Sequence, residues 1–303
     1  MERRGVLPAN YVMENMNMKN ACDLHTHSVF SDGTYTPRSL VRAAKALGLG
    51  AVALTDHNTI DGLPEFMAAA EEAGINAVPG VEFSTNFEGL DVHILGLFIR
   101  PEDHGRISDL LAEGCRQKEQ SNIDLVNALR ADGYEVDYAA IRAGSSKGQI
   151  NRAHIAAALT EKGYTPSIKA AFDPLLSAQY GYYREPKRPG SFEIIRFIKS
   201  LGAVAVLAHP LLTMEEPTLR RFLVPAVESG LDAKETLYYT YDAETPALAE
   251  RFAAEFGLLR SGGSAFHGSI KPDTRLGTGR GTLHVPLALY EALREKASGS
   301  GRI

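Results

Sequence analysis

Short apolar runs alternate with amphipathic stretches through most of this 303-residue chain, and this alternation constrains the fold more than any other feature. The runs ACDLHTH, AVALTDH, INAVPGVEFST and AVAVLAHP are typical of buried strands, because each is short and rich in small or β-branched apolar residues. Intervening stretches such as TPRSLVRAAKALG carry apolar residues at helical spacing, from Leu40 to Leu47. Strands that alternate with helices favour a parallel sheet or barrel, so we expect an α/β fold.

The alternation is interrupted between residues 101 and 189. The stretches ISDLLAEGCRQKEQSNIDLVNALRADG and RAHIAAALTEKG predict helices there, and no run in this segment predicts a strand. We therefore expect a helical insertion domain at 101–189. It would divide a barrel formed by 21–100 and 190–297, with a loose arm at 1–20.

Composition disfavours several classes of protein. The formal net charge of −5 gives no support for a long nucleic-acid footprint, although a local cluster of cations can still hold a small anionic substrate. No stretch reaches the ~18 apolar residues of a membrane span. Two cysteines are too few for a disulfide framework, and the start of the chain lacks the apolar core of a secretory signal. We therefore expect a cytoplasmic protein that does not contact membranes; nothing in the sequence indicates an oligomeric state.

Most of the predicted strands end in a cluster that contains histidine or carboxylate residues. The clusters are HTH at 25–27, TDH at 55–57, GVE at 80–82, AHP at 208–210 and AFH at 265–267. The carboxyl ends of parallel strands meet at one edge, so we expect these side chains to gather at a single mouth. A doubly wound sheet is disfavoured, because HTHSVFSDG stands where a glycine-rich phosphate loop would follow the first strand.

Imidazoles and carboxylates gathered at one mouth are typical of a site for several divalent metal ions. His25 and His27 lie two apart on a strand and therefore point to one face. Imidazole suits ions of borderline softness such as zinc, manganese or iron. Glu82 ends a buried strand, where a carboxylate costs free energy unless it is paired or metal-bound. Asp32 as a turn residue and Asp56 as a helix cap are structural alternatives, but the shared position of the clusters favours a metal site.

The order of these motifs resembles that of one known family. DLHTHSVFSDG, ALTDHNT, PGVEFS, HILG, the Arg-Ala-His of 152–154, VLAHP and GGSAFHGSIKP resemble the PHP (polymerase and histidinol phosphatase) family of metal-dependent phosphoesterases. The resemblance runs from about Asp23 to Val285 and implies a distorted (β/α)7 TIM-like barrel with a helical insertion. It is strongest to the branch that includes nucleoside 3′,5′-bisphosphate phosphatases and 5′-to-3′ exonucleases of short oligoribonucleotides. It implies a hydrolase that uses two to three divalent metal ions (Mn, Zn or Fe) on a small phosphorylated substrate.

The resemblance also implies roles for individual residues. The implied metal ligands form three sets: His25, His27 and Glu82; Glu82, His93 and His154; and Asp32, His57 and His267. His209 and Asp56 are the catalytic candidates, with His209 near the phosphate as a ligand, an orienting group or a proton donor. Taken alone, His154 on a predicted helix and His93 at the start of a strand are also compatible with structural roles.

Three basic residues are candidates for contact with the phosphate or base of a substrate. Arg152, Arg184 and Lys271 qualify because forked or point cations suit phosphate oxygens, and the alternative for each is a solvated surface charge. Tyr182 and Tyr183 are able to stack on a nucleobase, although packing is the commoner role of tyrosines at such a boundary.

Residue 265 departs from the family pattern. The last motif of the family is Ser-Asp-x-His, and this chain has Ala265 where the Asp normally stands. The resemblance places that Asp beside His25, His27 and Glu82 around the first metal ion. Alanine offers no lone pair, so the first site would keep three protein ligands and bind its ion more weakly.

Two alternative functions follow from the same residues. A catalytically silent nucleotide- or metal-binding protein would explain Ala265, whether that residue is natural or engineered. An amidohydrolase-like C–N hydrolase would also place a His-x-His pair on its first strand. It is disfavoured because no lysine is positioned to bridge metals and Glu82 fills the bridging position.

Overall fold

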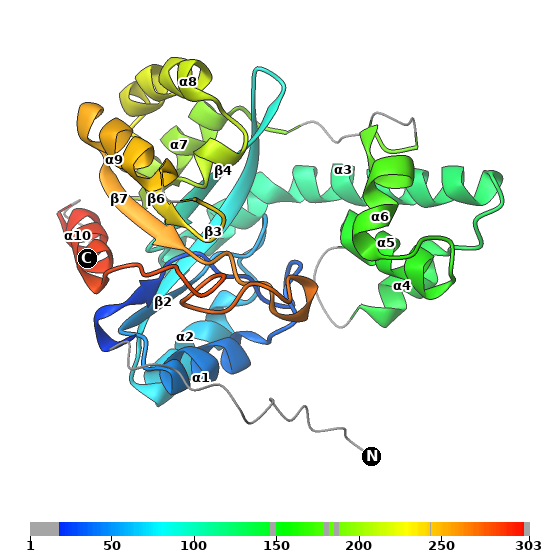
Figure 1. Cartoon of the computed structure of the whole chain (residues 1–303), viewed down its shortest axis with the longest axis horizontal. Helices are drawn as coiled ribbons and strands as arrows, with labels where there is room; N and C mark the ends of the chain where they lie inside the picture. Colours follow the sequence, from blue (N-terminus) through cyan, green and yellow to red (C-terminus); the bar gives the residue numbers. More distant parts are fainter. Residues whose placement is uncertain (1–17, 146–149, 179–181, 185–187, 243, 300–303) are drawn as a thin grey trace.

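The structure is a computed structural model that describes residues 18–145, 150–178, 182–184, 188–242 and 244–299 (Figure 1). Its seven-stranded sheet follows the order of the sequence. The strands are β1 (Cys22–Asp23), β2 (Ala51–Leu54), β3 (Asn76–Phe87), β4 (Leu90–Leu97), β5 (Val204–Leu207), β6 (Ala233–Tyr238) and β7 (Leu259–Gly263). Neighbouring strands pair in parallel, except that β4 is antiparallel to both β3 and β5.

The sheet nearly closes on itself where the chain beyond β1 meets the end of β7. Leu24 N donates to Gly262 O at 3.2 Å, and His27 N donates to Phe266 O at 2.9 Å. A Cβ at position 263 would lie 2.4 Å from Cβ of His25, so only glycine allows this approach. The resulting barrel-like sheet confirms the expected (β/α)7 TIM-like fold.

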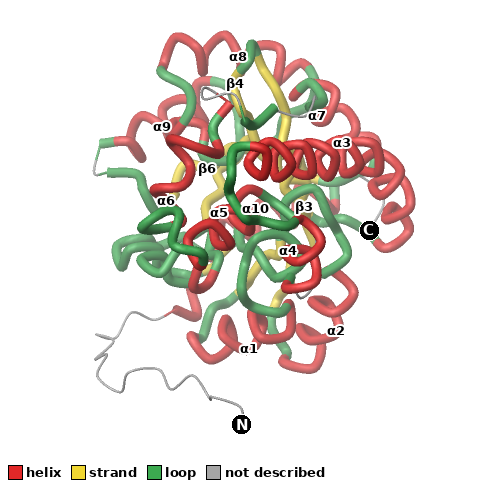
Figure 2. The backbone as a smooth tube through the Cα atoms, turned by 90° about the vertical axis from the view of Figure 1, so that its right-hand side faces the viewer, coloured by secondary structure: helices red, strands yellow, loops and turns green. Residues whose placement is uncertain are grey.

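Helices cover the outer face of the sheet, as the view in Figure 2 shows. They are α1 (Pro37–Leu47), α2 (Leu63–Ala73), α7 (Ser191–Ser200), α8 (Glu216–Glu228), α9 (Thr245–Glu255) and α10 (Leu287–Ser298). Short turns of helix lie at η1 (Met18–Asn20), η2 (Pro101–Asp103), η5 (Pro210–Leu212) and η6 (Gly268–Ile270). The boundaries of α1 follow the sequence signals: Thr36 caps it by accepting from Ser39 N at 3.1 Å, and Gly48 ends it in the left-handed region.

One strand departs from the expected parallel alternation. β3 and β4 are joined directly by a turn at Glu88 and Gly89, both of which have positive φ, and no helix separates them. Because β4 runs in the opposite direction, its beginning rather than its end lies at the barrel mouth. Ser84 pairs with His93 in this hairpin. A histidine near the start of β4 therefore reaches the same mouth as residues at the ends of the parallel strands.

The regular elements that the structure describes between β4 and α7 are all helical. It contains α3 (His104–Ala131), α4 (Tyr138–Gly144), α5 (Arg152–Glu161), α6 (Ile168–Ala171) and η3 (Phe172–Leu176), and α4 to α6 lie to one side of the barrel in Figure 1. These helices bury an apolar cluster of their own, which includes Leu125, Ile155 and Leu176. The division of the chain at residues 101 and 189 stays a prediction, and most of the predicted arm at 1–20 lies outside the described residues. No helix in the described ranges is both long and apolar enough to cross a membrane.

Candidate metal centre

The buried carboxylate of Glu82 lies at the centre of the barrel mouth and faces imidazoles on both of its oxygens. Its Oε2 is 3.1 Å from His25 Nε2, 3.3 Å from His27 Nε2 and 3.1 Å from His57 Nδ1. Its Oε1 is 2.7 Å from His93 Nδ1 and 3.2 Å from His209 Nε2. Five imidazoles, from the ends of β1, β2 and β5 and from β4, therefore converge on one carboxylate of β3.

Backbone hydrogen bonds fix the strand ends that carry these side chains. Glu82 N donates to Asp56 O at 3.1 Å, and Asn58 N donates to Glu82 O at 2.9 Å. These two bonds hold His57 beside Glu82 in a short parallel bridge. This main-chain pairing sets the backbone position from which the imidazole of His57 reaches Glu82 and Asp32.

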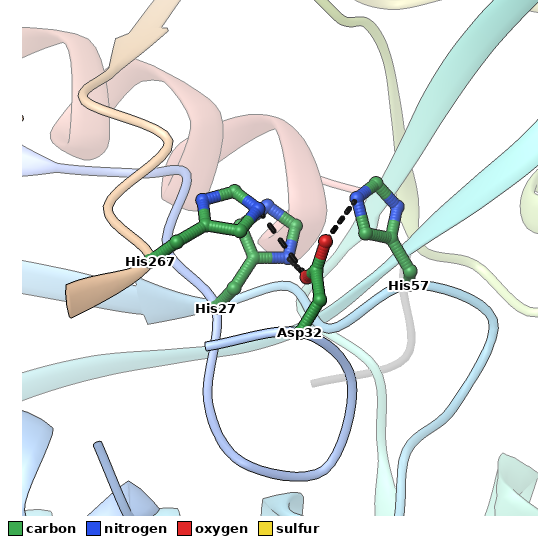
Figure 3. Close-up of side chains that lie close together, drawn as sticks. All are labelled: His27, Asp32, His57 and His267. Carbon is green, nitrogen blue, oxygen red and sulfur yellow. Dashed lines mark ion pairs between the residues drawn. The ribbon is translucent and has the colours of Figure 1, made fainter. Parts of the chain in front are cut away.

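A second cluster surrounds Asp32 (Figure 3). Asp32 Oδ1 is 3.3 Å from His267 Nε2 and 3.8 Å from His27 Nδ1, and Oδ2 is 3.9 Å from His57 Nε2. His267 Nδ1 lies 2.6 Å from the carbonyl oxygen of Ala265. Nδ1 donates to that carbonyl when it carries a proton, and Nε2 is the ring nitrogen that faces Asp32.

The described residues contain three groups whose ligand atoms lie within 4.8 Å of one another. The groups are His27, Asp32, His57 and His267; His25, Glu82 and His209; and His57, Glu82 and His93. The buried Nδ1 atoms of His27 and His57 have no hydrogen-bond partner in the described part of the chain. A carboxylate offers about four lone-pair positions, so hydrogen bonds alone cannot satisfy five imidazoles around Glu82. This donor set fits divalent cations that accept nitrogen and oxygen ligands.

The electrostatics of the mouth favour ionised carboxylates. Burial by itself would raise the pKa of Glu82, but the surrounding histidines outweigh burial and hold that pKa well below its usual value. Asp32 behaves in the same way, mainly because of His267 and His57. Burial lowers the pKa of His57 to about 4, which keeps its imidazole neutral and able to bind a cation. Burial also opposes protonation of His93, but Glu82 and Asp91 raise its pKa to about 9.

Asp56, predicted as a catalytic candidate, makes several hydrogen bonds to the loop after β1. Its carboxylate is buried and accepts hydrogen bonds from Ser28 N at 2.7 Å, Ser28 Oγ at 2.6 Å and Ser31 Oγ at 2.5 Å. It belongs to none of the three ligand groups. Because these hydroxyl and amide donors occupy both of its oxygens, Asp56 holds the loop that presents Asp32 to the mouth.

His154, predicted as a metal ligand, likewise lies outside the three groups. Its Nδ1 accepts a hydrogen bond from Asn151 N at 3.2 Å, and the side chain of Asn151 in turn accepts from Ala153 N and His154 N. This reciprocal capping box begins α5. The structure therefore gives His154 a helix-capping contact and does not bring it into contact with Glu82.

A cavity of about 470 Å³ lies between the metal-ligand groups and the helical segment. Asp32, His57 and His93 line this cavity together with Lys118, Arg152 and Arg188. Of the three basic residues predicted to contact substrate, Arg152 lines this cavity, whereas Arg184 and Lys271 do not. The guanidinium of Arg152 lies 4.2 Å from the ring centroid of Tyr183, which also lines the cavity. The hydroxyl of Tyr182 instead donates to Asp132.

Lys118 and Arg188 were not predicted from the sequence. Burial lowers the pKa of Lys118; Asp32 opposes that shift, whereas Arg188 and Arg152 add to it, so the three cations influence one another across the cavity. Lys118 has no ion pair with any residue that the structure describes. Arg188 pairs with Asp91, whose Oδ1 is also 3.1 Å from His93 Nε2. No sequence pattern distinguished Lys118 from the other charged residues of α3.

Sequence reasoning also missed Glu235, a fully buried carboxylate on β6 that contacts His25. Glu235 lies in AKETLYY, another short run of the strand and helix alternation, so the argument that identified Glu82 applies equally to this residue. A carboxylate inside a buried strand was the available signal.

Ala265 adopts a left-handed backbone conformation that alanine rarely takes. Its φ is +44°, in the left-handed region that asparagine and aspartate visit more readily than alanine. The preceding residue is fixed by Asp23, which accepts hydrogen bonds from Ser264 N at 2.9 Å and Ser264 Oγ at 2.5 Å. The backbone at position 265 therefore suits the aspartate of the Ser-Asp-x-His pattern, although the side chain is a methyl group.

Comparisons with known proteins agree with this geometry. Residues 23–186 match the PHP domain family. The chain is 33% identical to the 5′-3′ exoribonuclease of Haemophilus influenzae, over 82% of this chain and 91% of that protein. It is 28% identical to the 3′,5′-nucleoside bisphosphate phosphatase of Chromobacterium violaceum, over 81% of this chain and 86% of that protein.

Among solved structures, one from Bifidobacterium adolescentis that is described as a metal-dependent phosphoesterase superimposes with a TM-score of 0.80. The two are 30% identical, and the match covers 91% of this chain and 96% of that one. Both the sequence match over 23–186 and the shared fold with its cluster of histidines lead to the same conclusion: this chain belongs to the PHP domain family.

Proposed function

We propose that this protein is a metal-dependent phosphoesterase that hydrolyses phosphate monoesters of nucleotides, either nucleoside 3′,5′-bisphosphates or the 5′ ends of short oligonucleotides. The observation that carries this proposal is a single cavity lined both by candidate metal ligands and by Lys118, Arg152 and Arg188. An anionic group in such a cavity would lie close to imidazoles and cations together. The names of the relatives support the same substrate class.

The three ligand groups are the proposed sites for two or three divalent ions, with manganese, zinc and iron as candidates. Divalent ions bound there would polarise phosphoryl oxygens and lower the pKa of a coordinated water. The ligand residues would hold these ions close together, since Glu82 belongs to two of the groups and His57 also belongs to two.

The remaining residues of the cavity would bind and orient the substrate. Lys118 and Arg152 would hold phosphate oxygens, because charge-assisted hydrogen bonds to phosphate are stronger than neutral ones. The cavity volume of about 470 Å³ is in the range for a small-molecule ligand. Phe172 and Tyr183 add aromatic surface on the same side as Arg152, which suits a nucleobase or ribose.

His209 fits the role of a ligand or orienting group better than that of a positively charged proton donor. Burial lowers its pKa, and the opposing effect of Glu82 does not restore the ordinary value. Its Nε2 lies 3.2 Å from Glu82 and belongs to the group that contains His25. We therefore propose that His209 binds an ion or fixes a substrate oxygen through one ring nitrogen.

The amidohydrolase-like alternative lacks a bridging lysine among the described residues. Lys234 on β6 is fully buried and adjoins Glu235 in the sequence. Its Nζ donates to Ala249 O of α9 at 2.8 Å. That contact directs Lys234 toward the outer helices, so it is not available to bridge ions at the mouth. The cations of the cavity also suit a phosphate better than a neutral amide.

A comparison of the protein with its Ala265→Asp variant, each reconstituted with Mn²⁺, tests the proposed function. Release of phosphate from nucleoside 3′,5′-bisphosphates and of phosphate or mononucleotides from 5′-phosphorylated oligonucleotides is measured, with amide substrates in parallel. We expect release from nucleotides by both forms, faster in the variant because it regains a carboxylate. Failure of both forms on every phosphorylated substrate would overturn the proposal. Tight nucleotide binding without turnover in both forms would support a silent binding protein.

A further inference from the structure

Glu235 is fully buried on β6, and both of its oxygens have partners in the structure. Oε1 lies 3.0 Å from His25 Nδ1, and Oε2 accepts a hydrogen bond from the backbone amide of His209 at 2.7 Å. Glu235 belongs to none of the three ligand groups. One carboxylate therefore connects two candidate ligands from different strands, His25 beyond β1 and His209 beyond β5, without contacting the place where ions would bind.

The contact with His25 determines which ring nitrogen faces the metal centre. The imidazole of His25 lies between two carboxylates, with Nδ1 toward Glu235 and Nε2 toward Glu82. The carboxylate beside Nδ1 keeps the proton on that nitrogen when a cation displaces the proton of Nε2, so Nε2 is the nitrogen that binds the cation. Glu235 thus holds Nε2 of His25 available at the centre of the mouth.

The contact with His209 stabilises an unfavourable backbone conformation. His209 has φ +29° and ψ +48°, values that residues other than glycine rarely adopt, and Pro210 follows it. Such conformations persist only where surrounding contacts hold them. The amide of the preceding residue, Ala208, donates to His93 O of β4, but the amide of His209 points to Glu235 instead. This bond sets the direction in which the imidazole of His209 leaves the chain.

We propose that Glu235 is a positioning residue that fixes the ring orientation of His25 and the backbone of His209 together. This inference rests on the proposed function, because it assigns a role in the same metal centre. It extends that function by making the geometry of two ligands depend on one buried carboxylate of β6. Loss of the Glu235 carboxylate would change the orientation of both His25 and His209, although neither histidine is itself substituted.

The near-isosteric substitution Glu235→Gln separates the two contacts. A glutamine side chain has one accepting oxygen and one donating NH₂ group, so it can serve either His25 or the amide of His209 in the present geometry, but not both. If its oxygen faces His25, the His209 amide loses its acceptor and exchanges with solvent faster. If its oxygen faces His209, the NH₂ group takes the Nδ1 lone pair of His25 and the proton moves to Nε2, which weakens metal binding.

Two measurements on the full chain decide between these outcomes. Hydrogen exchange of the His209 amide is followed by NMR without added metal, with the Ala208 amide as internal reference. Mn²⁺ affinity is measured by calorimetry. We expect Glu235→Gln to give either at least roughly tenfold faster exchange at His209, with Ala208 unchanged, or a Mn²⁺ affinity lowered about 10- to 100-fold. Glu235→Ala should change both quantities, and Glu228→Gln, an exposed control on α8, should change neither.

The inference is overturned if Glu235→Gln folds normally and leaves both His209 exchange and Mn²⁺ affinity at the values of the unsubstituted protein. If Glu235→Ala fails to fold, Glu235→Gln alone decides. Absence of Mn²⁺ binding in the unsubstituted protein would contradict the proposed metal centre instead. The exchange of the His209 amide in the alanine variant would then still test the positioning role, since it needs no metal.

Discussion

Asp56 accepts two hydrogen bonds from Ser28, one from its backbone amide at 2.7 Å and one from its hydroxyl at 2.6 Å. A third bond from Ser31 joins the same carboxylate. The end of β2 is thereby fastened to the loop that follows β1. Asp32 follows Ser31 in that loop. The placement of one candidate ligand therefore depends on a carboxylate that belongs to none of the three ligand groups.

Asp56→Asn and Asp56→Ala should differ because the role of Asp56 is to accept hydrogen bonds. Asparagine keeps one accepting oxygen, and its NH₂ group can donate to the hydroxyl of Ser28, so we expect near-normal stability and activity. Alanine leaves the buried amide of Ser28 without a partner, and the free energy of unfolding should fall by about 1–3 kcal/mol. Chemical denaturation and phosphate release measure the two effects. Loss of activity in a stable asparagine variant would show that Asp56 transfers a proton.

Lys118→Gln should weaken nucleotide binding. Lys118 lines the cavity beside Arg152 and Arg188 and has no ion pair with any described residue, so its charge is available to a phosphate. A hydrogen bond to a charged group contributes ~1.5–3 kcal/mol, which corresponds to roughly 10- to 100-fold in dissociation constant. Calorimetric titration with a nucleoside bisphosphate measures this change. Lys162→Gln, an exposed lysine at the end of α5, is the matched control. Equal affinities in the two variants would remove Lys118 from the substrate site.

Metal affinity should rise with pH across the neutral range. Burial opposes protonation of His25 and His93, but Glu82 and neighbouring carboxylates outweigh burial and raise the pKa of His25 to about 10 and that of His93 to about 9. Below these values a cation must displace a proton from each ring, so binding releases protons and strengthens by up to about tenfold per pH unit for each proton released. Affinity should therefore increase from pH 6 toward pH 9. Titration in buffers of different ionisation enthalpy counts the protons, and a count of zero would contradict this electrostatic account.

The barrel and most of its polar mouth were predictable because parallel strands bring their ends to one edge. The positions of His25, His27 and Glu82 follow from that rule alone. The antiparallel direction of β4 was not predicted, although Glu88-Gly89 between two apolar runs is compatible with a tight turn. The direction of β4 follows from this two-residue connection, because strands joined by so short a turn pair antiparallel.

The helical segment was the least predictable part of the site. Which face of α3 turns toward the barrel depends on packing between distant elements, so the position of Lys118 in the cavity carried no local signal. The family motif that contains His154 indicated a histidine at this position but not which atoms it contacts. In the structure the ring of His154 accepts a hydrogen bond that caps α5. Glu235, by contrast, was available to the same reasoning that identified Glu82, since both are carboxylates within buried strands.

Anomalous X-ray diffraction from crystals of the Mn²⁺-loaded protein tests the central claim most directly. The arrangement of ligands predicts at least two manganese peaks at the barrel mouth. One should lie between Glu82 and its surrounding histidines, and another should lie among His27, Asp32, His57 and His267. Glu82→Gln should remove or weaken the first. A mouth without anomalous density at saturating Mn²⁺, Zn²⁺ or Fe²⁺ would contradict the assignment of these residues as a metal centre.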